Sequence, residues 1–326
     1  MASASRLTPS AFMLLLLMVA TAAVARADCT SRANYGGGVV FVTDREPLGD
    51  DRIFGGERAR GSDPDDYLIT GTLTAAKPHA VRGCTSRLAF YQALNHRFVR
   101  GHGRRALIYV HGYYTSFVTA ASDALALRRE LHFPGPIVLF SWPATVTAKP
   151  AYGVESRNAA WAAAHFSTFV RDLEDHFHGM PISFVARGVG ARFATAGLRI
   201  VRDPRCRGCF DHAVFFEPEI DRSLLNRRLT DVQLCDVRRD PRRSAAPITV
   251  YSATRAPSSC SGIDTVRVSP QTLASSGIDD PIASPAIAGD VRAVLAGVPV
   301  AARPIARRLR AALPRALRRR AHEGHR

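Results

Sequence analysis

The chain has almost no lysine, no long apolar run and no internal repeat. Its 44 Lys and Arg outnumber 28 Asp and Glu, for a formal net charge of +16, yet Lys77 and Lys149 are its only lysines. Such one-sided use of arginine is as compatible with a coding bias as with a binding surface, so the charge alone does not assign a nucleic-acid partner. A length of 326 residues, 46% of them hydrophobic, suits one large globular domain or two small ones and excludes a fibre.

The positive charge is concentrated at the two ends of the chain. Residues 303–326 hold nine Arg and one Glu, and two further Arg precede Asp28, the first acidic residue. We therefore expect a mildly basic body over residues 28–300 and an Arg-rich tail over residues 301–326. A solvated tail is the simplest interpretation, and its alternative is a tail that binds an anionic surface such as phospholipid or lipopolysaccharide.

No apolar stretch reaches the roughly 20 residues that a membrane-spanning helix needs. The longest, residues 11–20, follows Arg6 and precedes Ala25-Arg26-Ala27, which has the A-x-A form of a cleavage site. This pattern predicts a secretory signal peptide over residues 1–27 and an exported protein, periplasmic or extracellular. The acidic Asp28 before Cys29 does not suit lipid attachment at that cysteine.

All six cysteines follow the proposed cleavage site, and an even number in an oxidising compartment predicts disulfides. Proximity along the chain favours three pairs: Cys29 with Cys84, Cys206 with Cys209, and Cys235 with Cys260. The Cys206-x-x-Cys209 segment leaves a redox or metal site open as an alternative. The histidines show no spacing such as H-E-x-x-H, so we expect no metal and no cofactor.

From about residue 38, short β-branched apolar runs alternate with longer segments of helical periodicity. This alternation predicts a mainly parallel sheet with crossover helices on both faces, an α/β fold. The expected strands are Val39–Val42, Tyr67–Leu73, Ala106–Val110, Ile137–Phe140, Ile182–Ala186, Ala213–Phe216, Ile248–Ser252 and Thr265–Val268. The expected helices are Ser116–Leu131, Glu155–Phe177, Ala191–Val201, Arg222–Leu229 and Pro285–Leu295. Residues 45–66, rich in Asp, Gly and Arg, are expected to form a surface loop.

Three segments on this alternation carry a resemblance to a known family. They read LIYVHGYYTSF over residues 107–117, VLFSWP over residues 138–143 and ISFVARGVGAR over residues 182–192. They resemble a bacterial α/β-hydrolase family of unknown function with the pattern VHGYNxSF, FSWPS and AHSMGNR. Its FVxTxR and APDID segments correspond to residues 41–45 and 217–221. The resemblance covers about residues 38–296 and implies an α/β-hydrolase fold.

The resemblance also implies where an active site belongs. A His-Gly pair just after a strand is where such hydrolases place an oxyanion-hole N–H, here from Gly112 and Tyr113, with a second from Val189. The nucleophile elbow needs small residues two before and two after the nucleophile. Small residues flank the elbow here, but Gly188 stands where the family pattern has serine. Glycine suits the strained turn and supplies no nucleophile.

The other two members of a catalytic triad are also missing from their expected places. No histidine occurs from residue 213 to residue 321, and Ile278 lies in the segment where the family carries a histidine loop. The segment after the penultimate strand, residues 251–257, holds no carboxylate. Asp221 is an acid nearby that could equally cap the next helix.

These losses favour a non-catalytic binding protein whose former active-site cleft holds a small molecule or a protein partner. The candidate cleft residues are His111, Tyr113, Tyr114, Trp142, Arg187 and Asp221. The alternative is an ester-type hydrolase with a non-standard catalytic set, in which Arg187 and His111 are the first residues to test. Nucleic-acid binding is not expected, because export removes the usual partner and no recognition module is evident.

Overall fold

The computed structural model describes residues 39–48, 53–59, 69–74, 77–84, 90–92, 94, 95, 98, 104–144, 152–202, 209–235, 246–253, 260–268, 284–303 and 305. The predicted signal peptide, Cys29, Cys206, Ile278 and all but the first residues of the tail lie outside these ranges. Within them, no helix is long and apolar enough to cross a membrane.

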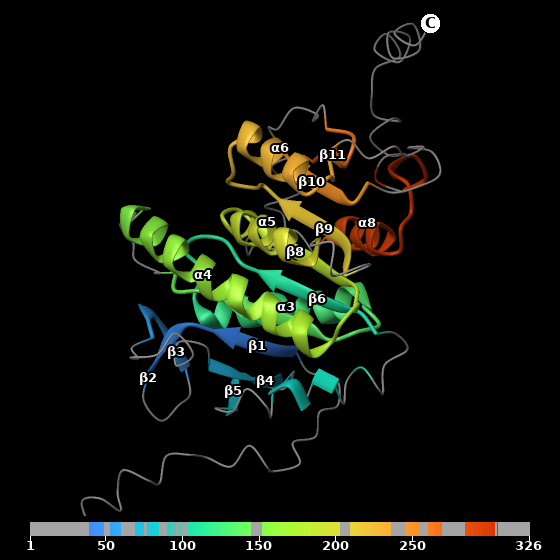
Figure 1. The fold of residues 1–326 in the computed structure, drawn as a ribbon. Helices are drawn as coiled ribbons and strands as arrows, with labels where there is room; N and C mark the ends of the chain where they lie inside the picture. The colour runs from blue at the N-terminus through green and yellow to red at the C-terminus, as the bar shows by residue number, and fades with distance from the viewer. Residues whose placement is uncertain are drawn as a thin grey trace, which may run out of the picture.

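A nine-stranded sheet in the order β11-β10-β9-β8-β6-β7-β1-β4-β5 forms the centre of the molecule (Figure 1). Its strands are β1 (Val39–Thr43), β4 (Ile69–Thr74), β5 (Lys77–Cys84), β6 (Ala106–Val110), β7 (Ile137–Ser141), β8 (Ile182–Arg187), β9 (Phe210–Phe216), β10 (Ile248–Ser252) and β11 (Ile263–Arg267). Pairing is parallel from β1 to β11, and only β4 and β5 at one edge run antiparallel to their neighbours. The predicted sheet class is confirmed.

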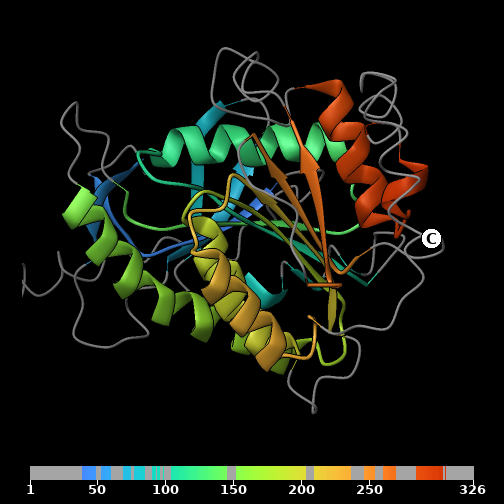
Figure 2. The same ribbon diagram turned by 90° about the horizontal axis from the view of Figure 1, so that it is seen from above.

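Helices cover both faces of the sheet, as Figure 2 shows. One face carries α4 (Tyr152–His176), α5 (Gly190–Val201) and α6 (Arg222–Asp231), and the other carries α3 (Phe117–Leu131) and α8 (Pro285–Leu295). A short 3-10 helix, η3 (Val300–Ala302), follows α8. Each helix buries one apolar stripe, because a parallel sheet exposes apolar side chains on both faces.

All eight predicted strands and all five predicted helices are present, with ends shifted by up to three residues. The expectation of a surface loop over residues 45–66 is wrong where the structure describes it. Arg45–Leu48 (β2) and Ile53–Arg58 (β3) form a separate antiparallel pair, and Phe54 is buried. The many polar residues and four glycines of this segment made the short alternation of its two strands hard to recognise. The Lys77–Cys84 strand was missed as well.

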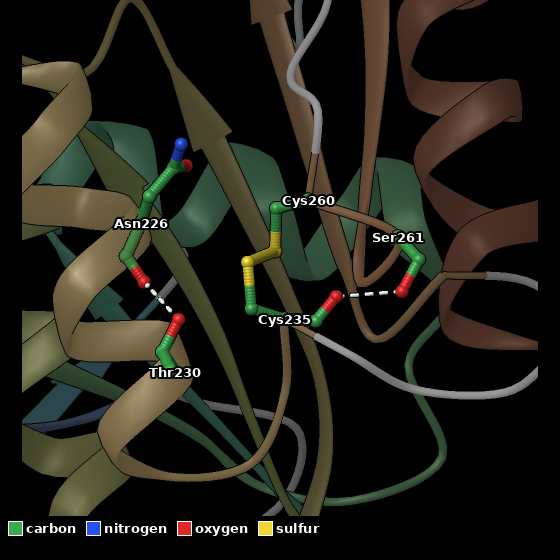
Figure 3. The surroundings of a disulfide bond; sticks show 5 residues. All are labelled: Asn226, Thr230, Cys235, Cys260 and Ser261. Carbon is green, nitrogen blue, oxygen red and sulfur yellow. Dashed lines mark hydrogen bonds between the residues drawn. A yellow bond between two sulfur atoms is a disulfide. The ribbon is translucent and has the colours of Figure 1, made fainter.

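A disulfide joins Cys235, just beyond α6, to Cys260, just before β11 (Figure 3). The two Cα atoms are 4.7 Å apart, and Ser261 Oγ donates a hydrogen bond of 2.6 Å to the Cys235 carbonyl beside the bridge. This is one of the three pairs that proximity predicted. The other two involve residues outside the described ranges and stay predictions.

The packed body extends past the residue expected to begin the tail. Arg303 is fully buried, with its Nε 3.7 Å from Asp290 Oδ1 and its Nη1 donating to Thr249 Oγ1. Ile305 is also buried. The first arginine of the basic segment is therefore a structural residue, and the cationic appendage begins beyond it.

Candidate functional site

The candidate site lies at the carboxyl ends of the central strands, where parallel α/β sheets bind ligands. β6 ends at Val110 and leads into His111-Gly112, while β8 ends at Arg187 and leads into Gly188. The two strands are neighbours in parallel register, so their exits lie side by side. A Cβ built on Gly188 would be 3.8 Å from the Gly112 Cα, which shows how closely the two glycines approach.

Gly188 makes the sharp turn between β8 and α5 that the elbow requires. Its φ is +48°, in the left-handed region that favours glycine. Its N–H donates to the Phe216 carbonyl at 3.0 Å, and its carbonyl accepts from the Glu219 N–H at 2.9 Å. The strand–turn–helix geometry of a nucleophile elbow is therefore present around a residue with no side chain.

Glu219 covers the position from which an elbow side chain would project. Its Oε1 lies 3.0 Å from a Cβ built on Gly188, a separation tighter than nearly all real Cβ contacts. The backbone of Glu219 is held by Gly188 and by Arg192, whose Nε donates to the Glu219 carbonyl at 2.7 Å. Desolvation raises the pKa of the Glu219 carboxyl, Arg192 lowers it, and the negative charge of Glu155 raises it further.

Glu155 brings a second carboxyl to the site from the first turn of α4. It is fully buried, and its Oε2 accepts a hydrogen bond of 3.2 Å from the Tyr114 N–H. Tyr114 itself has a φ of +54° and a half-exposed ring, so it stands at the rim of the site. Two carboxyl groups thus lie near the elbow, one buried and one accessible.

The expected oxyanion-hole residues lie at both strand exits. Gly112 and Tyr113 follow β6, and Val189 is the N-cap residue of α5. In the first turn of α5, the N–H groups of Ala191 and Arg192 already donate to the carbonyls of Gly188 and Val189, at 3.2 Å and 2.8 Å. The Tyr113 ring packs edge-on against Trp142, with centroids 5.7 Å apart.

His111 and Trp142 do not line a cleft, which corrects the expectation for both. Neither has any exposed surface, and their rings stack with centroids 5.3 Å apart. His111 Nδ1 donates to the Gly112 carbonyl at 2.8 Å, and its Nε2 receives a hydrogen bond from Arg45. Burial, and then the charge of Arg45, hold the pKa of His111 well below its usual value, so the ring is neutral.

Arg45 is the centre of this buried network. Burial lowers its pKa to about 9 despite the opposing charges of Asp44 and Glu155. Its guanidinium donates five hydrogen bonds of 2.7–3.2 Å to Ser141 Oγ, His111 Nε2 and the carbonyls of Gly55, Thr115 and Ala144. These partners come from β3, from the end of β7 and from the loops after β6 and β7, so Arg45 holds together the segments beneath the site.

The remaining predicted site residues have structural partners of their own. Arg187 is half-buried, with Nη1 3.5 Å from Asp123 Oδ2, and so points toward α3. Asp221 is exposed and caps α6, where its carboxylate accepts from the Leu224 N–H at 2.9 Å. Hydrogen bonds from Ser223 and from Leu224 lower the pKa of Asp221.

A carboxylate reaches the end of β10 from a different strand. Glu217, directly after β9, has a φ of +40°, and its carboxylate accepts from Ser252 Oγ at 2.8 Å and from the Ala253 N–H. Glu217 therefore occupies the place after β10 where a triad acid would be expected. Because both oxygens are engaged by the end of β10, Glu217 holds the strand ends together.

Among the residues described, no group of three or more His, Cys, Asp or Glu side chains is placed to hold a metal ion. The site residues expected from the sequence did not include Arg45, Glu155, Glu217 or Glu219. Glu217 and Glu219 flank the proline of the segment that matched the family's APDID pattern, so a signal was available for both. Glu155 belongs to a predicted helix, and the helical periodicity gave no indication that this residue lies near the site.

The sheet order, the crossover helices and the elbow together define an α/β hydrolase. The chain belongs to the family described as alpha/beta hydrolase of unknown function (DUF900), whose model matches residues 86–256, just over half of the chain. No curated protein matches the chain. The resemblance inferred from the three motifs is confirmed at the level of this family.

Proposed function

We propose that the protein is a non-catalytic member of this family that binds a small molecule or a protein partner over the elbow. One observation carries the proposal: Gly188 keeps the elbow conformation while the Glu219 carboxyl lies in tight contact with the position from which an elbow side chain would project. A serine there would need an adjacent base. The buried, neutral His111 is engaged at both ring nitrogens and cannot serve as that base.

Covalent labelling with a fluorophosphonate tests this proposal, because the reagent reports an activated serine wherever it lies in the chain. Purified mature protein should remain unlabelled by intact mass, while a serine esterase treated in parallel gains the adduct. Stoichiometric labelling at one residue would refute a non-catalytic role and identify the nucleophile by peptide mapping.

A hydrolase with a non-standard catalytic set is the second candidate, and the carboxyl of Glu219 favours it. An accessible carboxylate with a raised pKa can accept a proton from water as the water oxygen bonds to an acyl carbon. The same proton then passes to the leaving oxygen as its bond to that carbon breaks. In this case ester hydrolysis would occur without fluorophosphonate labelling, and Glu219→Gln would abolish it while Glu217→Gln lowered stability.

Export is part of the proposal and rests on the sequence of residues 1–27. The chain is expected in the periplasm or outside the cell, with the disulfide pairs formed after translocation. The Arg-rich segment beyond Ile305 would add attraction to anionic surfaces. Mass spectrometry of protein secreted by a bacterial host tests the first point, since cleavage before Asp28 is expected and an intact N-terminus would contradict it.

A further inference from the structure

A set of arginines lies on the outer side of α5 and α6, and one of them, Arg192, also holds the Glu219 carbonyl of the site described above. The set consists of Arg192, Arg199 and Arg202 from α5 and its end, with Arg227 and Arg228 from α6, and is called here the α5–α6 arginine surface. The two helices lie next to each other in the same layer in both views (Figures 1 and 2). Arg199, Arg202 and Arg227 are exposed, and the other two are half-buried.

Among the described residues, no salt bridge joins these guanidinium groups to a carboxylate. Arg228 Nη1 donates to Thr195 Oγ1 at 2.8 Å, and Arg202 Nε donates to the Val232 carbonyl at 3.3 Å. Arg227 contacts the Ser223 hydroxyl. These hydroxyls and carbonyls orient the cations, while the nearby carboxylates of Glu219 and Asp221 offset part of the charge of Arg192 and Arg227.

The cations are also close enough to repel one another. Burial is the main cause that lowers the pKa of Arg228, and the charges of Arg199 and Arg192 lower it further. Arg192 and Arg199 are two turns apart on the solvent side of α5, with Ala196 between them, and Arg228 bridges from α6 to the carbonyl of Arg192. A held cluster of like charges lowers its free energy when an anion binds it.

We propose that the α5–α6 arginine surface is a docking surface for anionic phospholipid headgroups. The surface is polar, since the exposed large hydrophobic residues of the described chain are Leu48, Tyr114 and Val154, none of them on α5 or α6. It therefore lacks the aromatic platforms on which single-stranded nucleic acids stack, and the apolar anchors that insert into a bilayer. The interaction that this polar, cationic surface favours is adsorption to an extended array of phosphates.

The choice of lipid over nucleic acid rests on the export proposed above and on the position of the surface. Arg192 follows Gly188 by one helical turn, so one end of this surface lies beside the elbow, while Arg199 and Arg202 lie at the opposite end of α5. The basic segment beyond Ile305 would add charge to the same association.

Vesicle co-sedimentation of the full mature chain tests the proposal. Binding is expected to phosphatidylcholine vesicles that contain phosphatidylglycerol, to be absent with phosphatidylcholine alone, and to weaken at high salt. The variant Arg199→Glu/Arg202→Glu should lower the bound-to-free ratio at least about tenfold. The control Arg129→Glu/Arg292→Glu makes the same change in net charge on α3 and α8, on the other face of the sheet, and should change the ratio less than about twofold.

The outcomes separate the alternatives. Equal losses in both double variants would mean adsorption by net charge and would overturn the proposal, as would loss on deleting residues 306–326 with no effect of the α5–α6 variant. Tighter binding of the α5–α6 surface to single-stranded DNA than to the vesicles would assign a nucleic-acid partner and overturn the lipid assignment. Unchanged circular dichroism and melting temperature in each variant ensure that the comparison concerns the surface alone.

Discussion

At the scale of single residues, the proposal of a non-catalytic protein rests on Gly188 and Glu219. A glycine at a φ of +48° keeps the turn, and the Glu219 carboxyl lies against the position from which a side chain would project. The glycine at this position was evident from the sequence because the flanking small residues fixed the register of the motif. The position of Glu219 was not evident from the sequence. Glu219 lies in a loop after a neighbouring strand, and it comes close to Gly188 only when the sheet is packed.

The charge of Glu219 is expected to destabilise the fold near neutral pH. Because the pKa is raised in the folded protein, the folded state resists ionisation, and this penalty is present above the usual pKa of a glutamate and absent well below it. Glu219→Gln should therefore raise the melting temperature at pH about 7 and give no gain at pH about 4. A gain of equal size at both pH values would show that charge is not the cause.

Arg45 is expected to be essential for the floor of the site. Arg45→Lys leaves several buried acceptors without a donor, because an ammonium cannot reach five groups spread around a planar guanidinium. Each unsatisfied buried group costs about 1–3 kcal/mol, so we expect a loss of at least about 3 kcal/mol in the free energy of unfolding. Urea denaturation measures it, with the exposed Arg129→Lys as a control that should change stability by less than about 0.5 kcal/mol.

At the scale of elements, the spacing of apolar residues and the positions of turn-forming residues predicted the strands of the sheet well. Strands β6, β7 and β8 are mostly apolar runs that end at polar or glycine residues. Such runs can be recognised in the sequence without knowing which strands pair with them. The β2–β3 pair was missed because its short strands contain Pro47 and two adjacent glycines, residues that usually mark loops. The buried positions of His111 and Trp142 were missed for a related reason: a motif gives the place of a residue in the chain, and packing decides its exposure.

The Cys235–Cys260 disulfide connects the end of α6 to the start of β11, and it is expected to stabilise that edge of the sheet. It closes a segment of 25 residues, for which the chain-entropy relation gives about 3.5 kcal/mol. The double variant Cys235→Ala/Cys260→Ala should therefore unfold at a lower urea concentration than the oxidised protein. Addition of a reductant should lower the midpoint of the parent protein more than that of the variant, which lacks only this pair; equal shifts in both would contradict a stabilising role for it.

At the scale of the whole molecule, the net charge of +16 divides into parts with different roles. Arg45 and Arg303 are buried and serve the fold, since their partners are core groups. The arginines of α5 and α6 are oriented by hydroxyls and carbonyls and only partly offset by Glu219 and Asp221, and the last arginines of the sequence form a basic segment. Composition alone could not distinguish these three classes, because exposure and partners are properties of the packed structure.

The central claim is that a complete α/β-hydrolase scaffold here performs no acyl transfer, and steady-state hydrolysis of short-chain nitrophenyl esters tests it most directly. Purified mature protein should release nitrophenol no faster than Glu219→Gln or Gly112→Val variants, and no faster than a heat-inactivated sample. Turnover above that background, lost in either variant with its fold intact, would contradict the account and place a working catalytic site at the elbow.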